Sequence, residues 1–237
     1  MTTIELAGLT ARIAGDPPTS RESPLVILLH GYGAPGDDLI SLADEITAPQ
    51  GTRFLFPHGP IDLESTMGPG SGARAWWPID MVRMQVALMT GQLDALANEL
   101  LPGLQASIGP ITSFVRAASE RFELPTSRIV LGGFSQGAIL SLAAALENAW
   151  ELGGLLLFSP TLVDSNSVNA RARAKQQACV LSHGQVDPIL PFTSSQRLHS
   201  LLVECGWHVD WVPFMGGHGI PPAALAAAGR LIARAFP

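Results

Sequence analysis

The sequence predicts an α/β fold with a mostly parallel central sheet and helices on both of its faces. Two observations lead to this prediction. Short apolar runs alternate with amphipathic stretches along the 237 residues, with Gly or Pro at the joins, and 47% of the residues are hydrophobic. Strands that alternate with helices favour a parallel sheet, and the apolar content suits a large core. We expect a single domain over residues 1–237, without a large cap domain.

The strands are predicted from apolar runs. The first, at 24–30, is continuously apolar, which is typical of a strand that is covered on both faces. Five more are predicted at 52–56, 128–132, 154–158, 178–182 and 208–213. Because ligands of such sheets bind outside the carboxyl ends of the strands, we expect the functional residues in the loops that follow them.

Amphipathic stretches between these runs predict helices at 37–46, 136–148, 192–204 and 221–236. Residues 57–110 interrupt the alternation. They begin with a loop rich in Gly, Pro and Trp and continue as a helical pattern that Pro102 and Pro110 are expected to break. Long loops in compact domains are usually functional, so we expect this segment to line the active site.

Charge and composition exclude several classes of protein. The net charge is −6, and the densest basic cluster is only Arg171, Arg173 and Lys175, so we expect no nucleic-acid partner. No apolar stretch reaches the ~18 residues of a membrane span, and the first residues lack a signal-peptide pattern. Cys179 and Cys205 are expected to be reduced core residues, which favours a cytoplasmic location.

Cofactors are not expected. The six histidines show no metal-ligand spacing. The sequence also lacks both nucleotide-binding motifs: the P-loop pattern G-x-x-x-x-G-K-[ST], and the Rossmann fingerprint in which G-x-G-x-x-G is followed about 20 residues later by Asp or Glu. A small molecule is therefore the predicted partner. The sequence leaves open whether the protein is a monomer or a homodimer.

The nucleophile is predicted from residues 133–137, Gly-Phe-Ser-Gln-Gly, which match the G-x-S-x-G pattern. They lie between a predicted strand and a predicted helix, where a sharp turn exposes the serine hydroxyl. The flanking glycines leave room for this turn, and the helix dipole favours negative charge that develops there. We therefore predict that Ser135 is the catalytic nucleophile.

A serine hydroxyl is a poor nucleophile without a base, and in this arrangement the chain order is Ser, then Asp or Glu, then His. His199 is expected in a helix and His208 in a strand, and His183 precedes the best acid, which breaks the order. His218 lies in a Gly-rich loop between the last strand and the last helix. We predict that His218 is the base.

Three aspartates compete as the acid that orients this base. Asp210 is expected within a strand, and Asp164 within a polar loop that is open to solvent. Asp187 follows the strand 178–182, at the edge where the catalytic loops should gather. A carboxylate there can accept the imidazole N–H, so Asp187 is the predicted acid.

An acyl-transfer site also needs two N–H donors for the oxyanion. One is expected from the residue after the nucleophile, Gln136, and the other from the loop after the first strand, through the amide of Tyr32. His30, which precedes this loop, is expected to fix it by a hydrogen bond.

Four motifs then suggest a family. They are residues 29–33 (Leu-His-Gly-Tyr-Gly), 132–138 (Gly-Gly-Phe-Ser-Gln-Gly-Ala), 183–191 (His-Gly-Gln-Val-Asp-Pro-Ile-Leu-Pro) and 217–221 (Gly-His-Gly-Ile-Pro). With them the chain resembles the carboxylesterase/phospholipase family of α/β-hydrolases, which includes acyl-protein thioesterases and small bacterial carboxylesterases. The resemblance implies the α/β-hydrolase fold and a triad of Ser135, Asp187 and His218. It also places the oxyanion donors at Tyr32, where the family often has Leu, and Gln136.

Together these observations predict a carboxylic ester hydrolase that forms an acyl-enzyme on short to medium acyl esters. Trp76 and Trp77 are predicted to bind the substrate, with Met81 and Met84 beside them; the alternative is that these side chains pack in the core. An acyl-thioesterase or a lysophospholipase of the same family is the alternative activity. A peptidase would share every catalytic residue, and a non-catalytic binding protein on the same scaffold is disfavoured by the intact triad.

Overall fold

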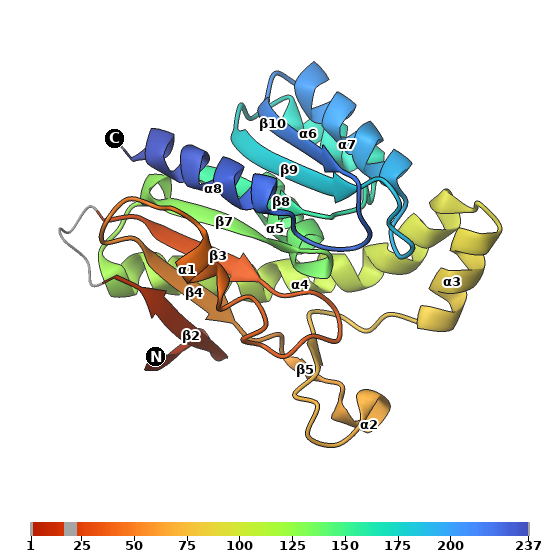
Figure 1. Ribbon diagram of the computed structural model, residues 1–237, viewed down its shortest axis with the longest axis horizontal. Helices are drawn as coiled ribbons and strands as arrows, with labels where there is room; N and C mark the ends of the chain where they lie inside the picture. Colours follow the sequence, from red (N-terminus) through yellow and green to blue (C-terminus); the bar gives the residue numbers. More distant parts are fainter. Residues whose placement is uncertain (1, 17–22, 237) are drawn as a thin grey trace.

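The central sheet is mostly parallel and is extended at one edge by an antiparallel hairpin. The computed structural model describes residues 2–16 and 23–236, and within them the sheet has eight strands in the order β1-β2-β4-β3-β7-β8-β9-β10 (Figure 1). The strands are β1 Thr2–Leu6, β2 Leu9–Gly15, β3 Leu25–Leu29, β4 Arg53–Pro57, β7 Ile129–Phe134, β8 Gly154–Phe158, β9 Ala178–Gly184 and β10 His208–Phe214. All neighbouring pairs from β4 to β10 are parallel, which confirms the expected sheet.

The six predicted strands are present, and each end lies within two residues of its expected position. The hairpin of β1 and β2 was not predicted. Its two strands join at Ala7 and Gly8, whose φ values of 48° and 79° suit a tight hairpin turn. Most of β1 is exposed, so it lacks the apolar alternation that would have indicated a strand.

Helices cover both faces of the sheet. The helices α4 (Leu93–Phe122), α5 (Gln136–Glu147), α6 (Ser165–Ala172) and α7 (Phe192–Glu204) share one apolar core with the sheet, and α1 (Leu42–Glu45) and α8 (Pro222–Ala235) share the other (Figure 1). The helix expected at 37–46 is shorter than predicted, because its first residues form turns. Within the described residues, no helix combines the length and apolar character that crossing a membrane would require.

The helix α4 corrects one expectation. Pro102 and Pro110 were expected to break the helical pattern, yet α4 continues through both. Its buried residues recur at helical spacing and include Leu96, Leu100, Leu104, Ile111, Phe114, Val115 and Ala118. A proline inside a helix costs about 3 kcal/mol, whereas burying each large apolar side chain contributes roughly 1.5–3 kcal/mol. Burial along the whole helix therefore outweighs the two prolines.

The segment between β4 and α4 lies beside the loop that follows β3. It contains β5 (Ile61–Asp62), α2 (Glu64–Met67), β6 (Arg74–Ala75) and α3 (Met81–Met89). Outside this segment, a 3-10 turn, Thr126–Arg128, follows α4. The Gly33 amide donates to the Arg74 carbonyl at 2.9 Å, and the Arg74 amide donates back to the Ala34 carbonyl at 3.0 Å. In Figure 1, α3 lies on the side toward which the parallel strands point.

Candidate active site

The turn between β7 and α5 holds Ser135 in an unusual backbone conformation. Its φ and ψ are 53° and −116°, a region that a residue with a side chain rarely occupies, and its amide donates to the Phe158 carbonyl at 2.8 Å. The flanking glycines make this turn feasible, because a Cβ atom at Gly133 or Gly137 would collide with the Leu29 carbonyl oxygen. The unusual backbone conformation of this turn thus falls on the predicted nucleophile.

His218 and Asp187 meet beyond the ends of two neighbouring strands. His218 lies in the loop after β10, and Asp187 in the loop after β9. The Nδ1 atom of His218 is 2.6 Å from Oδ2 of Asp187. The ring of Phe134, next to Ser135, lies 4.7 Å from the His218 ring, and the Ser159 hydroxyl holds the His218 loop by donating to the Gly219 carbonyl at 2.9 Å.

Asp187 is held ionised by its hydrogen bonds. Burial alone would raise the pKa of this carboxyl, whose side chain is 0% exposed. Hydrogen bonds from His183 and His218, and from the amides of Ile189 and Leu190 at 2.8 and 2.9 Å, outweigh burial and hold the pKa well below its usual range. A carboxylate of this kind can stabilise the imidazolium that forms when His218 accepts a proton.

His183, which the argument from chain order excluded as the base, lies beside the site. Its side chain is fully buried, and its Nε2 atom lies 3.2 Å from Oδ2 of Asp187. The spacing in the segment His183-Gly-Gln-Val-Asp187, at the end of a strand, was the available signal. Chain order argued only against His183 as the base, and the structure places its ring against Oδ2 of Asp187, the same oxygen that His218 contacts.

One cavity joins the predicted nucleophile, base and oxyanion residues. A cavity of about 140 Å³ is lined by Ser135, His218, Tyr32, Gln136 and Trp77. Its other lining residues are almost all apolar: Gly31, Ala34, Ile79, Met81, Met84, Leu100, Phe134, Ile139, Ile189 and Leu190. Asp187 lies behind His218. Several of these walls come from the segment 57–110.

The two tryptophans lie differently. Both are almost fully buried, at 3% and 2% exposed for Trp76 and Trp77, but only Trp77 is among the described residues that line the Ser135 cavity. The indole N–H of Trp76 donates to the His30 carbonyl at 2.9 Å, and its amide donates to Oε1 of Gln136 at 2.9 Å. Gln136 donates in turn from Nε2 to the Trp77 carbonyl at 2.9 Å. The tryptophan segment thus connects the loop after β3 to the residue after Ser135.

His30 fixes the loop after β3, as expected. Its Nδ1 atom is 2.8 Å from the Gly31 carbonyl oxygen, and its Nε2 atom accepts the Gly59 amide at 2.9 Å. Nδ1 must therefore carry the ring proton. Burial lowers the pKa of His30 to about 4, so the ring is neutral in the folded protein at neutral pH.

The amides of Tyr32 and Gln136 are the predicted oxyanion donors. Among the described residues, neither amide donates a hydrogen bond to another protein group. Gln136 is the first residue of α5, where amide groups have no partner within the helix. The Tyr32 hydroxyl lies 3.5 Å from the Ile79 carbonyl oxygen, across the cavity wall.

The residues set aside as base or acid have other partners. The His199 ring stacks on Trp211, with 5.2 Å between ring centroids. Asp210 pairs with Arg230 at 3.2 Å. Asp164 caps α6, because its side chain accepts the Ser167 amide.

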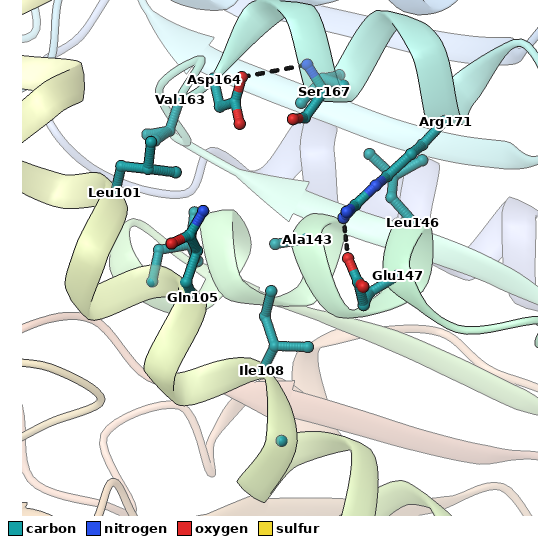
Figure 2. Close-up of a pocket in the computed structure, with 13 residues that line it drawn as sticks. Leu101, Gln105, Ile108, Ala143, Leu146, Glu147, Val163, Asp164, Ser167 and Arg171 are labelled. Atoms are coloured by element: carbon teal, nitrogen blue, oxygen red, sulfur yellow. Dashed lines mark hydrogen bonds and ion pairs between the residues drawn. The ribbon is translucent and has the colours of Figure 1, made fainter.

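A second cavity, of about 340 Å³, lies between α4, α5 and α6, away from Ser135 (Figure 2). Leu101, Ile108, Ala143 and other apolar side chains form much of its wall. Its charged groups are already engaged: Arg171 pairs with Glu147, and Asp164 caps α6 (Figure 2). None of its described lining residues forms a nucleophile and base pair, so this cavity is not the candidate active site.

Comparisons with known proteins identify a family. Residues 13–235 match the phospholipase/carboxylesterase family. Acyl-protein thioesterase 1 of Gibberella zeae is 28% identical over 93% of this chain and 94% of its own length, and acyl-protein thioesterase 1 homolog 1 of Dictyostelium discoideum is 26% identical over 91% and 92%.

Solved structures show the same fold. The crystal structure of esterase PE8 matches with a TM-score of 0.79 at 25% identity, over 95% of this chain and 98% of that one. A carboxylesterase from Mesorhizobium loti matches with a TM-score of 0.72 at 20% identity, over 97% and 96%. These findings confirm the α/β-hydrolase fold and the hydrolase class that the motifs implied. The chain belongs to the phospholipase/carboxylesterase family.

Proposed function

We propose that the protein hydrolyses carboxylic esters through a covalent acyl-enzyme, with Ser135 as nucleophile, His218 as general base and Asp187 as the acid that orients it. One observation carries the proposal. His218 lines a single cavity with Ser135 on one side and contacts the buried Asp187 carboxylate at 2.6 Å on the other. This is the order of groups that activates a serine hydroxyl.

The proposed reaction has two half-reactions. Ser135 Oγ attacks the ester carbonyl carbon while Nε2 of His218 takes the hydroxyl proton, and the proton then passes to the departing alcohol oxygen. Water attacks the acyl-enzyme with His218 again as base, and the carboxylic acid leaves as Ser135 regains its proton. Asp187 stays ionised throughout, because its pKa is held below its usual range.

The oxyanion of both tetrahedral intermediates is proposed to lie against the amides of Tyr32 and Gln136. The two amides come from different loops beside one cavity, and neither donates to a protein group in the described part of the chain. Gln136 also begins α5, so the positive end of the helix dipole favours the developing charge. Losing one such donor typically lowers kcat about 10²–10³-fold.

Short to medium acyl esters fit the cavity best. Its apolar wall includes Trp77, Met81 and Met84, and its volume of about 140 Å³ is well below the roughly 300–1,000 Å³ of pockets for drug-sized ligands. The segment 57–110 supplies several of these side chains and is proposed as the substrate-facing part of a single domain. Trp76 is assigned to holding the loops.

The second candidate activity is acyl-thioester hydrolysis. It is favoured by the curated relatives from Gibberella zeae and Dictyostelium discoideum, which are named acyl-protein thioesterases. The same triad would serve, since the thiolate of a thioester is a better leaving group than an alkoxide. We also propose that the protein is cytoplasmic and that its substrate is a small-molecule ester. Sedimentation would distinguish a monomer from a homodimer.

The test is Ser135→Ala. The variant should lose turnover of p-nitrophenyl butyrate and labelling by a fluorophosphonate, while its thermal unfolding stays close to that of the wild type. A panel of p-nitrophenyl esters of increasing length, an acyl-thioester and a lysophospholipid would then rank the substrate classes. Substantial butyrate turnover by Ser135→Ala would refute the proposed nucleophile.

A further inference from the structure

His183 is a fully buried titratable residue to which the proposed mechanism gives no role. It lies near the end of β9, four residues before the catalytic acid. Its Nε2 atom is 2.9 Å from the Leu190 carbonyl oxygen and 3.2 Å from Oδ2 of Asp187, and its Nδ1 atom is 2.7 Å from Oγ of Ser195. Both ring nitrogens therefore have polar neighbours.

The position of the ring proton follows from what these neighbours can do. Nε2 faces a carbonyl oxygen and a carboxylate oxygen, and both are acceptors only. Nδ1 faces the Ser195 hydroxyl, which can donate or accept, and whose oxygen also lies 2.6 Å from the Pro160 carbonyl oxygen. Whether Ser195 donates to His183 or to Pro160, a proton is needed on Nε2 of His183.

This proton faces the catalytic carboxylate as well as the Leu190 carbonyl, which is its nearer hydrogen-bond partner at 2.9 Å. Oδ1 of Asp187 accepts the amides of Ile189 and Leu190. Oδ2 is contacted by two imidazole rings, by Nδ1 of His218 at 2.6 Å and by Nε2 of His183 at 3.2 Å. The two rings lie against the same oxygen, so its direction depends on both of them.

We propose that His183 is a positioning residue for the catalytic acid, whose Nε2–H holds Oδ2 of Asp187 in the orientation that receives the Nδ1–H of His218. The inference rests on the proposed triad. Ser195 sets the ring of His183 in turn, through Nδ1. His183 is not among the described residues that line the substrate cavity, so its effect should fall on kcat and leave KM nearly unchanged.

Two conservative variants separate the ring nitrogens. In His183→Gln the side-chain amide reaches the place of Nε2 and can still donate toward Asp187. In His183→Asn the amide reaches only the place of Nδ1, so it can contact Ser195 but leaves Oδ2 of Asp187 with one donor fewer. Both replacements are polar and uncharged, which makes them matched.

The expected result is a split between them with p-nitrophenyl butyrate as substrate. His183→Asn should lower kcat by about 10–100-fold, the effect typical of removing a side chain that orients a metal-binding or catalytic residue. The kcat of His183→Gln should be at least about tenfold higher than that of His183→Asn. KM should change little in either variant. In an Asp187→Ala background, assayed at high enzyme concentration, the ratio of kcat between the Gln and Asn variants should fall to about one, because the group being positioned is gone.

Thermal unfolding of each variant shows whether it is folded. If His183→Asn does not fold, Ser195→Ala replaces it: this change frees Nδ1, and should lower kcat only when Asp187 is present. Equal kcat values for folded Gln and Asn variants would overturn the inference. So would a ratio, or a Ser195→Ala effect, that persists without Asp187. If Asp187→Ala alone keeps wild-type kcat, the proposed triad fails, which is a distinct outcome.

Discussion

The amide of Trp76 and the side chain of Gln136 are joined by a 2.9 Å hydrogen bond between residues 60 positions apart in the chain. The same glutamine donates to the Trp77 carbonyl, and the Trp76 indole donates to the His30 carbonyl. The residue after the nucleophile is thereby connected to the loop that carries the second proposed oxyanion amide. A side chain predicted for substrate binding thus contributes to holding the two donor loops together.

Gln136→Ala should lower kcat with p-nitrophenyl butyrate by about tenfold or more, because the two oxyanion amides lose their common attachment. It should also lower the free energy of unfolding by about 1–3 kcal/mol, since the Trp76 amide and the Trp77 carbonyl are left buried without partners. Steady-state kinetics and urea denaturation measure the two effects. Gln105→Ala, an exposed glutamine of α4, is the control and should change neither. Wild-type kcat in Gln136→Ala would show that the attachment is dispensable.

The pH dependence of the free energy of unfolding should reveal the lowered pKa of His30. Burial lowers its pKa to about 4 in the folded protein from the ordinary value of 6.5, so between these values the unfolded chain binds more protons. The stabilisation is complete above pH 6.5 and is lost as the pH falls toward 4, by about 2 kcal/mol between pH 7.5 and 5.

The measurement is urea denaturation of the wild type and of His30→Asn at both pH values. The variant should be less stable at pH 7.5, and its deficit should shrink by about 2 kcal/mol at pH 5, because only the wild type carries the His30 imidazole, whose protonation burial opposes. Parallel loss of stability in the two proteins would contradict the assignment.

Enlarging the cavity should shift the acyl-chain preference. Met84 lines the cavity from α3 and is 6% exposed. In Met84→Ala, kcat/KM for p-nitrophenyl hexanoate or octanoate should rise relative to butyrate, by up to about fourfold for each methylene that the new space buries. Met89→Ala, on the same helix but 78% exposed, should leave the chain-length profile unchanged. An identical profile in both variants would place the acyl chain elsewhere.

The prolines of α4 predict a stabilising substitution. Pro110 is exposed and lies inside the helix, where it supplies no amide to the hydrogen-bond ladder. Pro110→Ala should raise the free energy of unfolding by about 2 kcal/mol, after allowing for the greater freedom of the unfolded chain.

Gly109→Ala is the matched control in the same turn, since a Cβ there meets open space. Its expected gain is only about 0.5–1 kcal/mol, from helix propensity alone. Thermal unfolding compares the two. A gain for Pro110→Ala no larger than that for Gly109→Ala would show that the proline ring does not strain the helix.

The hydrophobic periodicity of the sequence predicted most of the strands and helices, for a physical reason. The parallel strands are buried on both faces, so β3 and β8 are continuously apolar and easily found in the sequence. The hairpin of β1 and β2 has one exposed strand at the sheet edge and leaves little pattern. The course of α4 through Pro102 depends on burial against the core, which the local sequence does not show.

In the candidate site, too, some residues could be predicted from the sequence and others could not. Ser135, Asp187 and His218 each follow a strand of one parallel sheet, so chain order and loop position could select them. The contacts of Trp76 and His183 depend on which side of a loop a buried ring faces. The sequence therefore left open whether Trp76 binds substrate or packs in the core, and chain order removed His183 as the base without assigning it another role.

The helix α3 has one further consequence, for how specificity could change. It begins at the cap formed by Asp80 and is followed by Gly91, whose φ is +70°. Between these points it contributes Met81 and Met84 to the proposed acyl wall, whereas the proposed nucleophile, base, acid and oxyanion amides all come from other segments. On the proposed assignment, substitutions at the cavity-facing positions of residues 80–91 would therefore alter acyl-chain selectivity while leaving the catalytic residues in place.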